Sequence, residues 1–270
     1  MRNHSFLAVL ALAAIGGLFL AGCSNNSTNP RFGTMNVRMT DDPGNFDHVN
    51  LVITQVSTRM EDADTTGTDS TEGGWVVLKN SAATYDLIAL QNGVFATIGT
   101  GALPAGHYTQ IRLKLGAGST VVVDGVTYPL TVPSGRQSGL KLVGNFDVPA
   151  GGTIDVALDF DASRSIHQTG AGQYMLKPVI KILSTRVAGS ITGHIAPAGQ
   201  PATIYAFQSP DTLGSARAGA DGSFTLAVLS PGVYEVAVRP DSAYRDTSLT
   251  NVSVVAGQTT NVGTVQLTHQ

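Results

Sequence analysis

Apolar and polar residues alternate along most of the chain after residue 33, and this period of two predicts β-strands with one buried face. In the first such segment Met35, Val37 and Met39 alternate with polar neighbours. The pattern returns in the segments 49–53, 111–115, 121–132, 154–160 and 174–183. Only residues 85–95 could form a short helical turn. The pattern therefore predicts an all-β protein.

A second series of short strands is predicted after residue 188. These strands cover residues 203–208, 224–228, 234–239, 249–255 and 261–267, separated by Gly-containing turns. Short strands at a spacing of about 8–12 residues are typical of a β-sandwich. The sequence thus predicts two tandem β-sandwich domains, residues 33–184 and 188–268, each long enough for a small core of its own.

Turn residues refine this prediction. Asp124 and Gly125 separate two apolar runs and predict a hairpin. Pro178 cannot donate a ladder hydrogen bond, so it predicts an edge or a bulge in the segment 174–183. Tyr108 and Tyr234 each follow a Pro-containing turn that ends in Gly, and each could hydrogen-bond back to the backbone as a tyrosine corner does.

The first 22 residues have the features of a signal peptide: Arg2, a nearly continuous apolar run, and small residues before Cys23. The run Leu20-Ala21-Gly22-Cys23 resembles the lipobox of bacterial lipoproteins. That resemblance implies a diacylglycerol thioether on Cys23, cleavage before it, and acylation of the new amino group. The alternatives are an uncleaved membrane anchor, although the run is short for a span of about 20 residues, and an ordinary secretory signal.

Residues 23–32 are interpreted as a lipidated, flexible tether, because residues 24–30 contain no apolar side chain to bury. Several acyl chains would give stable membrane anchoring through Cys23. By resemblance to proteobacterial lipoproteins, Ser24 in place of Asp favours the outer membrane if the organism is Gram-negative. The predicted location is the bacterial cell envelope, with the periplasmic and surface-exposed faces both left open.

Composition narrows the classes of partner. Lys plus Arg is 16 against 19 Asp plus Glu, a net charge of −3, which excludes both a basic nucleic-acid surface and an acidic tail. Hydrophobic residues make up 42% of the chain, too many for a disordered protein. The single Cys excludes a disulfide framework and a multi-cysteine metal site.

Residues 33–183 resemble a bacterial envelope family, domain of unknown function 4382. The resemblance is carried by four stretches: Gly33-Thr34-Met35-Asn36-Val37-Arg38-Met39-Thr40-Asp41-Asp42-Pro43, Leu103-Pro104-Ala105-Gly106-His107-Tyr108, Leu158-Asp159-Phe160-Asp161-Ala162-Ser163-Arg164, and Leu176-Lys177-Pro178-Val179-Ile180. It implies a fold and an envelope location, and it brings no activity with it.

Residues 188–267 resemble the carboxypeptidase regulatory-like domain, a transthyretin-like sandwich related to starch-binding-like folds. The motifs are Gly189-Ser190-Ile191-Thr192-Gly193, Asp221-Gly222-Ser223-Phe224 and Leu229-Ser230-Pro231-Gly232-Val233-Tyr234. The resemblance implies an accessory or spacer module, and some relatives bind glycans. Sequence alone does not select a sugar-stacking residue, because core packing is equally expected for the candidate aromatics, Tyr205, Phe207, Phe224 and Tyr234.

One acidic segment is a candidate calcium loop. Asp62, Asp64 and Asp69 provide oxygen ligands, with Gly67 at the sixth position of the loop. The pattern then departs from a calcium loop, because Glu72 falls one residue before the position of the bidentate ligand. The alternative interpretation is a solvated acidic loop between two strands.

Asp159 and Asp161 form a second candidate, since on a strand they lie on one face about 7 Å apart. That separation falls in the range of the carboxylate pairs of glycosidases. The alternative is turn capping, or pairing with one of three nearby cations: Arg112, Lys114 or Arg164. Asp41 and Asp42, which precede Pro43-Gly44, are interpreted as turn formers.

Catalysis has little support in the sequence. No nucleophile elbow is present in the sequence. The histidines after the signal peptide lack metal-ligand spacing; they are His48, His107, His167, His194 and His269. The sequence predicts no cofactor and a non-catalytic envelope lipoprotein with a binding or scaffolding role, whose partner is a glycan or another envelope protein. The alternatives are a carbohydrate-binding lipoprotein acting through the C-terminal module, and an envelope hydrolase using Asp159 and Asp161.

Overall fold

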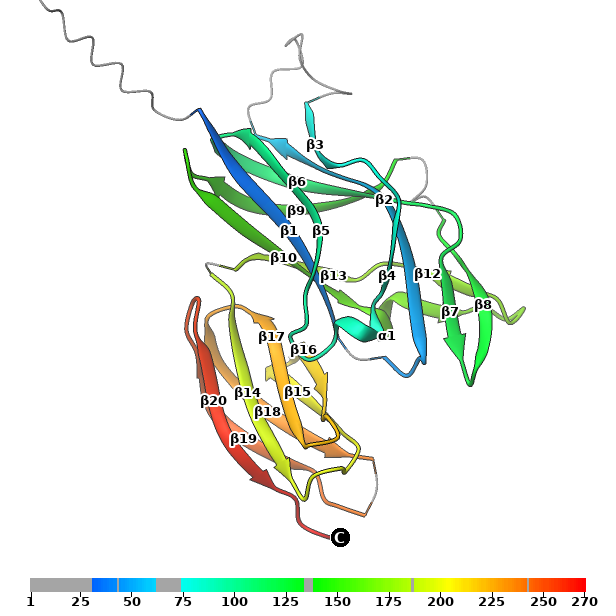
Figure 1. Cartoon of the computed structure of the whole chain (residues 1–270). Helices are drawn as coiled ribbons and strands as arrows, with labels where there is room; N and C mark the ends of the chain where they lie inside the picture. Colours follow the sequence, from blue (N-terminus) through cyan, green and yellow to red (C-terminus); the bar gives the residue numbers. More distant parts are fainter. Residues whose placement is uncertain (1–30, 43, 62–73, 134–137, 186, 242) are drawn as a thin grey trace, which may run out of the picture.

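The computed structural model describes residues 31–42, 44–61, 74–133, 138–185, 187–241 and 243–270. Within them the chain forms two β-sandwiches, one after the other in sequence (Figure 1). The N-terminal sandwich contains strands β1 to β13, and the C-terminal sandwich contains β14 to β20. The start of β1 and the C terminus lie at opposite ends of the molecule. The predicted all-β fold with two sandwiches is confirmed.

The first sheet of the N-terminal sandwich has the strand order β13-β10-β1-β5, in which β1 and β10 are parallel. Its strands are β1 (Phe32–Asp42), β5 (Ala96–Pro104), β10 (Thr153–Asp161) and β13 (Ile180–Ser184). The apolar residues of β1 and β10 point to the same side because the two strands are in register, with Val37 opposite Val156. This apolar side forms one wall of the core.

The second sheet has the order β11-β12-β8-β7-β2-β6-β9, and β3 and β4 also pair with β2. Its strands are β2 (His48–Met60), β3 (Trp75–Lys79), β4 (Ala83–Asp86), β6 (Gly106–Leu115), β7 (Thr120–Val123), β8 (Val126–Thr131), β9 (Leu140–Val148), β11 (Ile166–Gln168) and β12 (Tyr174–Leu176). Leu51, Ile53, Ile111 and Leu113 are fully buried between the sheets. These residues belong to segments in which alternation predicted a buried face.

The C-terminal sandwich pairs a three-stranded sheet, β17-β14-β20, with a four-stranded sheet, β16-β15-β18-β19. Its strands are β14 (Gly189–Ala196), β15 (Ala202–Gln208), β16 (Asp211–Arg217), β17 (Ser223–Leu229), β18 (Gly232–Pro240), β19 (Thr247–Val254) and β20 (Thr259–Gln266). It encloses a separate hydrophobic cluster that includes Ile191, Ile204, Leu226 and Val236.

The predicted turns are present. Asp124 (φ 50°) and Gly125 (φ 74°) link β7 to β8, and two positive φ values in a two-residue loop are typical of a type I′ hairpin. The Tyr108 hydroxyl donates a 2.8 Å hydrogen bond to the Pro104 carbonyl, and the Tyr234 hydroxyl donates one of 2.7 Å to the Ser230 carbonyl. Both predicted tyrosine corners are therefore confirmed.

Three details of the prediction need correction. A 3₁₀ turn, η1 (Ile88–Leu90), lies inside the expected segment 85–95, but a second helical turn, α1 (Ala162–Ser165), was not expected. The segment 174–183 forms two strands in different sheets, because the extended pairing is interrupted around Pro178, between β12 and β13. Several strands were not predicted, among them β5, β9 and β16, and the sequence of β16, DTLGSAR, has little apolar alternation.

Candidate functional site

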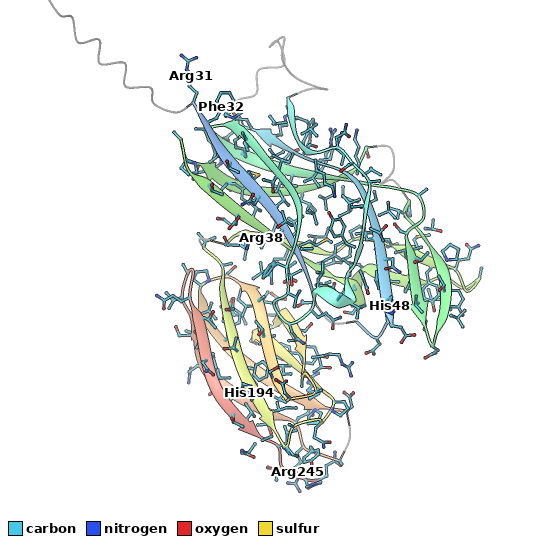
Figure 2. All side chains as sticks on the ribbon, viewed as in Figure 1. Arg31, Phe32, Arg38, His48, His194 and Arg245 are labelled. Atoms are coloured by element: carbon cyan, nitrogen blue, oxygen red, sulfur yellow. The ribbon has the colours of Figure 1, made fainter. Side chains whose placement is uncertain are left out.

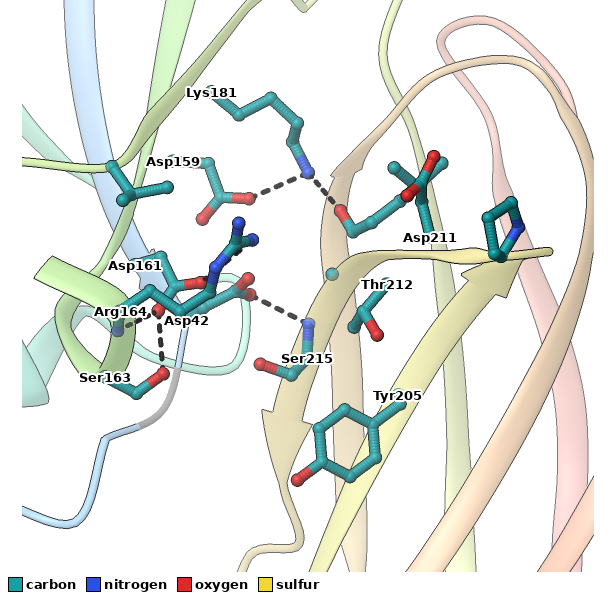
Figure 3. Close-up of a pocket in the computed structure, with 14 residues that line it drawn as sticks. Asp42, Asp159, Asp161, Ser163, Arg164, Lys181, Tyr205, Asp211, Thr212 and Ser215 are labelled. Atoms are coloured by element: carbon teal, nitrogen blue, oxygen red, sulfur yellow. Dashed lines mark hydrogen bonds and ion pairs between the residues drawn. The ribbon is translucent and has the colours of Figure 1, made fainter.

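The outer face of the first sheet carries a row of polar residues at the junction of the two sandwiches. In the parallel register of β1 and β10, Asp42 lies opposite Asp161, and in the antiparallel register of β10 and β13, Asp159 lies opposite Lys181. Alternation places these side chains on the face away from the core. That face meets β16 of the C-terminal sandwich (Figure 3).

Three hydrogen bonds join the two sandwiches here. The Ser215 backbone N–H donates to Oδ1 of Asp42 at 3.0 Å, and Nζ of Lys181 donates to the Leu213 carbonyl at 2.7 Å. Nη1 of Arg217 donates to Oδ1 of Asn45 at 3.0 Å. All three reach β16, so β16, which was not predicted, is the strand through which the C-terminal sandwich docks.

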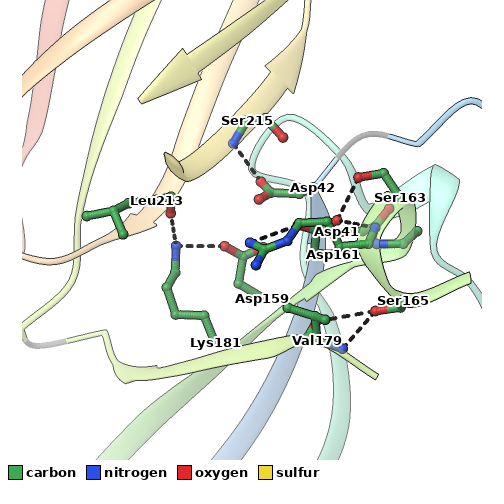
Figure 4. A network of polar contacts seen from close by, with 12 residues as sticks. Asp41, Asp42, Asp159, Asp161, Ser163, Ser165, Val179, Lys181, Leu213 and Ser215 are labelled. Atoms are coloured by element: carbon green, nitrogen blue, oxygen red, sulfur yellow. Dashed lines mark hydrogen bonds and ion pairs between the residues drawn. The ribbon is translucent and has the colours of Figure 1, made fainter. Parts of the chain in front are cut away.

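The two candidate carboxylates are both engaged within their own sandwich (Figure 4). Asp159, only 5% exposed, lies 3.0 Å from Nζ of Lys181. Asp161 caps α1: its Oδ1 accepts from the backbone N–H of Arg164 and from the hydroxyl of Ser163, both at 2.8 Å, and the Arg164 guanidinium lies 3.7 Å from Oδ2. The capping interpretation is therefore confirmed for Asp161.

Arg112 and Lys114, which were also expected as possible partners of Asp159 and Asp161, lie elsewhere in the sandwich. Arg112 stacks on the Trp75 ring at 4.3 Å and donates to Ser57, so it does not pair with Asp159. Lys114 lies on the same strand as Arg112, in the other sheet. Asp159 instead pairs with Lys181, because these two residues are directly opposite on neighbouring strands.

Asp41 and Asp42 were interpreted as turn formers, and the structure corrects this. Both are the last residues of β1, and both accept hydrogen bonds from distant backbone N–H groups. Asp41 is buried and accepts from Ala162 at 3.0 Å, whereas Asp42 accepts from Ser215. Their carboxylates therefore join segments that are far apart in the sequence.

Burial at the junction changes the protonation of these acids. Desolvation, with the negative charge of Asp159 as the next cause, raises the pKa of Asp42 to about 8. Desolvation also raises the pKa of Asp159, against the opposing charge of Lys181. It raises the pKa of Asp41 well above its ordinary value, although the Ala162 hydrogen bond acts in the other direction. Because a buried charge without a counter-ion is costly, protonation of Asp42 at neutral pH follows.

A cavity of about 540 Å³ lies between the sandwiches at this place and is partly open to solvent. The N-terminal wall includes Asp42, Asp159, Asp161, Ser163, Arg164 and Lys181, and the C-terminal wall includes Tyr205, Asp211, Thr212, Leu213, Gly214 and Ser215. Pockets with converging polar groups occur often at domain boundaries and are candidate binding sites. The walls offer hydrogen-bond donors, acceptors and one aromatic ring.

The structure separates the four aromatic residues of the C-terminal sandwich. Phe224 and Tyr234 are 2% and 1% exposed and belong to the core. Tyr205 and Phe207 are half-buried, on the opposite face of β15, with ring centroids 5.8 Å apart. The Arg239 guanidinium lies 5.2 Å from the Tyr205 ring centroid. Of the two pairs, Tyr205 and Phe207 are the one outside the core, next to the Arg239 guanidinium.

The remaining candidates do not converge. Cys23, the signal peptide 1–22 and the calcium candidates Asp62, Asp64 and Asp69 lie outside the described residues. Within the described part of the chain, no group of three or more His, Cys, Asp or Glu side chains is placed to hold a metal ion. His48 and His194 lie on different sandwiches (Figure 2).

Histidines with acidic partners are at the surface. His48 and His107 each lie 2.7 Å from a carboxylate, of Asp86 and Asp147 respectively. The hydrogen bond that His107 makes to the Asp147 carboxylate raises the pKa of His107 above its ordinary value. No helix among the residues that the structure describes has the length and apolar character needed to cross a bilayer.

The junction residues that sequence reasoning missed are Asp42 as a docking acceptor, Lys181 and Ser215. One available signal was the sequence around Lys181, an isolated cation in the strand after Pro178. A buried acid such as Asp159 needs a partner, and a lysine three strands further along the chain can provide it. No pattern identifies Ser215, because it contributes only its backbone N–H.

Fold and junction define the class of this protein: two all-β sandwiches joined by a polar interface. Residues 32–178 match the family described as "Domain of unknown function (DUF4382)", and because the match covers more than half of the chain, the protein belongs to that family. A search of curated proteins gives no match.

Several solved structures have a distant likeness to the chain. The minor pilin GBS52 of Streptococcus agalactiae is 11% identical with a TM-score of 0.23, covering 87% of this chain and 96% of the pilin. A fimbrial protein from Bacteroides ovatus is 8% identical with a TM-score of 0.27, covering 89% and 51%. The Bacillus anthracis TIE protein is 12% identical with a TM-score of 0.22, covering 87% of this chain, which spans only 34% of that protein.

Proposed function

We propose that this protein is a non-catalytic, membrane-anchored protein of the bacterial cell envelope with a binding or scaffolding role. The observation that carries the proposal is the state of the best catalytic candidates. Asp159 is held by Lys181, and Asp161 caps α1 and pairs with Arg164. Both carboxylates are held by partners within the N-terminal sandwich, which is a structural task.

The membrane anchor in this proposal is Cys23, on the strength of the Leu-Ala-Gly-Cys sequence that precedes the polar tether. The tether leads into β1, and the C-terminal sandwich lies at the far end of the molecule (Figure 1). An anchored chain would therefore present its C-terminal sandwich away from the membrane. We assign that sandwich to the carboxypeptidase regulatory-like class as part of the same proposal.

Two experiments test this role. Labelled fatty acid should be incorporated into the full chain in a bacterial host and should be absent from the Cys23→Ser variant. A pull-down from membranes with the full chain should recover a defined envelope partner, and this partner should be lost when the C-terminal sandwich face is altered. Release of the unlabelled chain into the medium contradicts the anchor. Turnover of an envelope substrate that disappears in Asp159→Asn/Asp161→Asn contradicts the non-catalytic role.

Carbohydrate binding through the C-terminal sandwich is the second candidate function. Tyr205 and Phe207 favour it because their rings lie on the outer face of β15, while Phe224 and Tyr234 are in the core. The two half-buried rings supply apolar contact, and the Tyr205 hydroxyl adds a polar edge, which together suit a sugar. Affinity electrophoresis of the full chain in glycan-containing gels tests it: retardation that disappears in Tyr205→Ala/Phe207→Ala is the expected result, and migration unaffected by any glycan contradicts it.

A further inference from the structure

The cavity between the sandwiches has three polar groups without a protein partner. Oδ2 of Asp42, the hydroxyl of Tyr205 and the hydroxyl of Thr212 form no hydrogen bond within the described residues, and all three residues line the cavity. Oδ1 of Asp42 is occupied by the Ser215 N–H, which fixes the orientation of the carboxyl group. The cavity therefore has hydrogen-bonding groups from both sandwiches, and that of Asp42 has a fixed orientation.

Charge on the N-terminal wall of the cavity is balanced. Two of the three carboxyl groups on the N-terminal wall have their own cations, since Asp159 pairs with Lys181 at 3.0 Å and Asp161 pairs with Arg164 at 3.7 Å. The third, Asp42, has no cation of its own, and burial raises its pKa to about 8, so it is neutral near pH 7.

This balance selects the chemical class of ligand. An anion finds no unpaired cation on this wall, and a cation finds no unpaired negative charge there near neutral pH. Asp211, on the other wall, adds a carboxylate that is exposed to water, where solvent and salt weaken its attraction for a cation. A neutral molecule with many hydroxyl groups and one apolar face meets all the groups present, because a neutral carboxyl group both donates and accepts hydrogen bonds.

We infer that the cavity is a binding site for a neutral sugar residue of a glycan, built jointly from Asp42 of the N-terminal sandwich and Tyr205 and Thr212 of the C-terminal sandwich. The volume of about 540 Å³ lies within the range of about 300–1,000 Å³ for small-molecule sites. This inference rests on the carbohydrate-binding function. It differs in placing the site between the sandwiches, so that neither alone completes it.

The test uses titration calorimetry of the full chain near pH 5.5, where Asp42 is neutral and chitosan amino groups are protonated, with oligosaccharides of three charge classes. The neutral probes are maltotetraose, cellotetraose and mannotetraose, the cationic probe is a chitosan tetramer, and the anionic probe is tetragalacturonate. We expect at least one neutral probe to bind and both charged probes to bind about tenfold or more weakly. Tyr205→Ala and Asp42→Leu should weaken the neutral probe about tenfold. Asp42→Asn keeps a neutral hydrogen-bonding group, so it should retain binding.

Phe207→Ala is the matched control, because Phe207 is on the same face of β15 but does not line the cavity. Thermal unfolding of each variant separates loss of binding from loss of folding. Binding that is lost in Phe207→Ala and kept in Asp42→Leu overturns the cavity site and leaves carbohydrate binding in place. Preference for a charged probe overturns the neutral class. If no glycan of any class binds, both the cavity site and the carbohydrate-binding function fail, whereas the scaffolding role is unaffected.

Discussion

The carboxyl group of Asp42 at the end of β1 accepts a 3.0 Å hydrogen bond from the backbone N–H of Ser215 on β16, a residue 173 positions later in the chain. This contact ties the central parallel pair of the N-terminal sandwich to an outer strand of the C-terminal sandwich. Because Asp42 is largely buried and close to Asp159, its protonation state is linked to the docking of the two sandwiches.

Stability should fall as the pH rises. Asp42 has an ordinary pKa of 3.8 and a folded pKa of about 8, so the folded chain keeps a proton that the unfolded chain has released. The stabilisation is complete below about pH 4 and is lost as the pH rises through about 8. Asp41 and Asp159, whose pKa values are also raised by burial, act in the same direction, while Lys181 opposes it. Urea unfolding across this range measures the effect.

The control for this profile is Asp42→Asn, which is neutral at every pH and can still accept from the Ser215 N–H. We expect the slope of the free energy of unfolding against pH to become shallower in this variant. A wild-type profile that rises with pH, or one that Asp42→Asn leaves unchanged, contradicts the assignment.

Lys181 should contribute more to the free energy of unfolding than an ordinary surface cation does. It pairs with Asp159, which is 5% exposed, and its Nζ also donates to the Leu213 carbonyl. Lys181→Met leaves a buried carboxylate without its partner and should cost about 1–3 kcal/mol. Adding Asp159→Leu should recover much of this loss, because an apolar pair of similar size can replace a buried ion pair.

The control here is Arg239→Met, which removes an exposed pair with Asp246 at 3.8 Å and keeps an unbranched side chain beside the Tyr205 and Phe207 rings. Exposed pairs contribute about 0–1 kcal/mol, so this change should have a small effect in the same urea titration. Equal costs for Lys181→Met and Arg239→Met would show that the junction is no different from the open surface.

The sequence allowed much of the architecture to be predicted because alternation reports directly which side of a strand is buried. Met35, Val37 and Met39 were expected to be in the core, and all three are fully buried. The Asp124-Gly125 hairpin was predictable for a local reason as well, since its two positive φ values need residues that tolerate them.

The junction was not predictable from alternation. Ala157 and Asp159 lie on the polar side of β10, which was expected to face solvent, yet they are 0% and 5% exposed because the C-terminal sandwich covers them. A period of two identifies two faces and says nothing about what covers the second one. The docking strand β16 has little alternation of apolar and polar residues. Its Ser215 and Leu213 act through backbone atoms, which every residue has, so the sequence does not identify them.

The two tyrosine corners should contribute similarly to the two sandwiches. Each hydroxyl donates to a backbone carbonyl four residues earlier, and burial raises the pKa of Tyr108 to about 12. Tyr108→Phe and Tyr234→Phe should each cost about 0.5–1.5 kcal/mol, the net value of one hydrogen bond. Tyr128→Phe is the matched control, since the Tyr128 ring packs on Tyr174 and its hydroxyl has no hydrogen bond within the described residues. Chemical denaturation of the three variants compares them, and a cost for Tyr128→Phe as large as the others contradicts the prediction.

Two Asp-Gly turns should respond differently to the same substitution. Gly125 (φ 74°) and Gly222 (φ 83°) both need a backbone conformation that alanine disfavours, which costs about 1 kcal/mol at either position. A Cβ on Gly125 meets open space, whereas a Cβ on Gly222 meets the carbonyl oxygen of Ile195, which belongs to β14. Gly222→Ala must therefore move the backbone as well, and its cost should exceed that of Gly125→Ala by about 1 kcal/mol or more. Urea titration of both variants measures the loss of unfolding free energy. Equal losses would contradict the prediction, because they would mean that a Cβ at Gly222 fits beside β14 without moving the backbone.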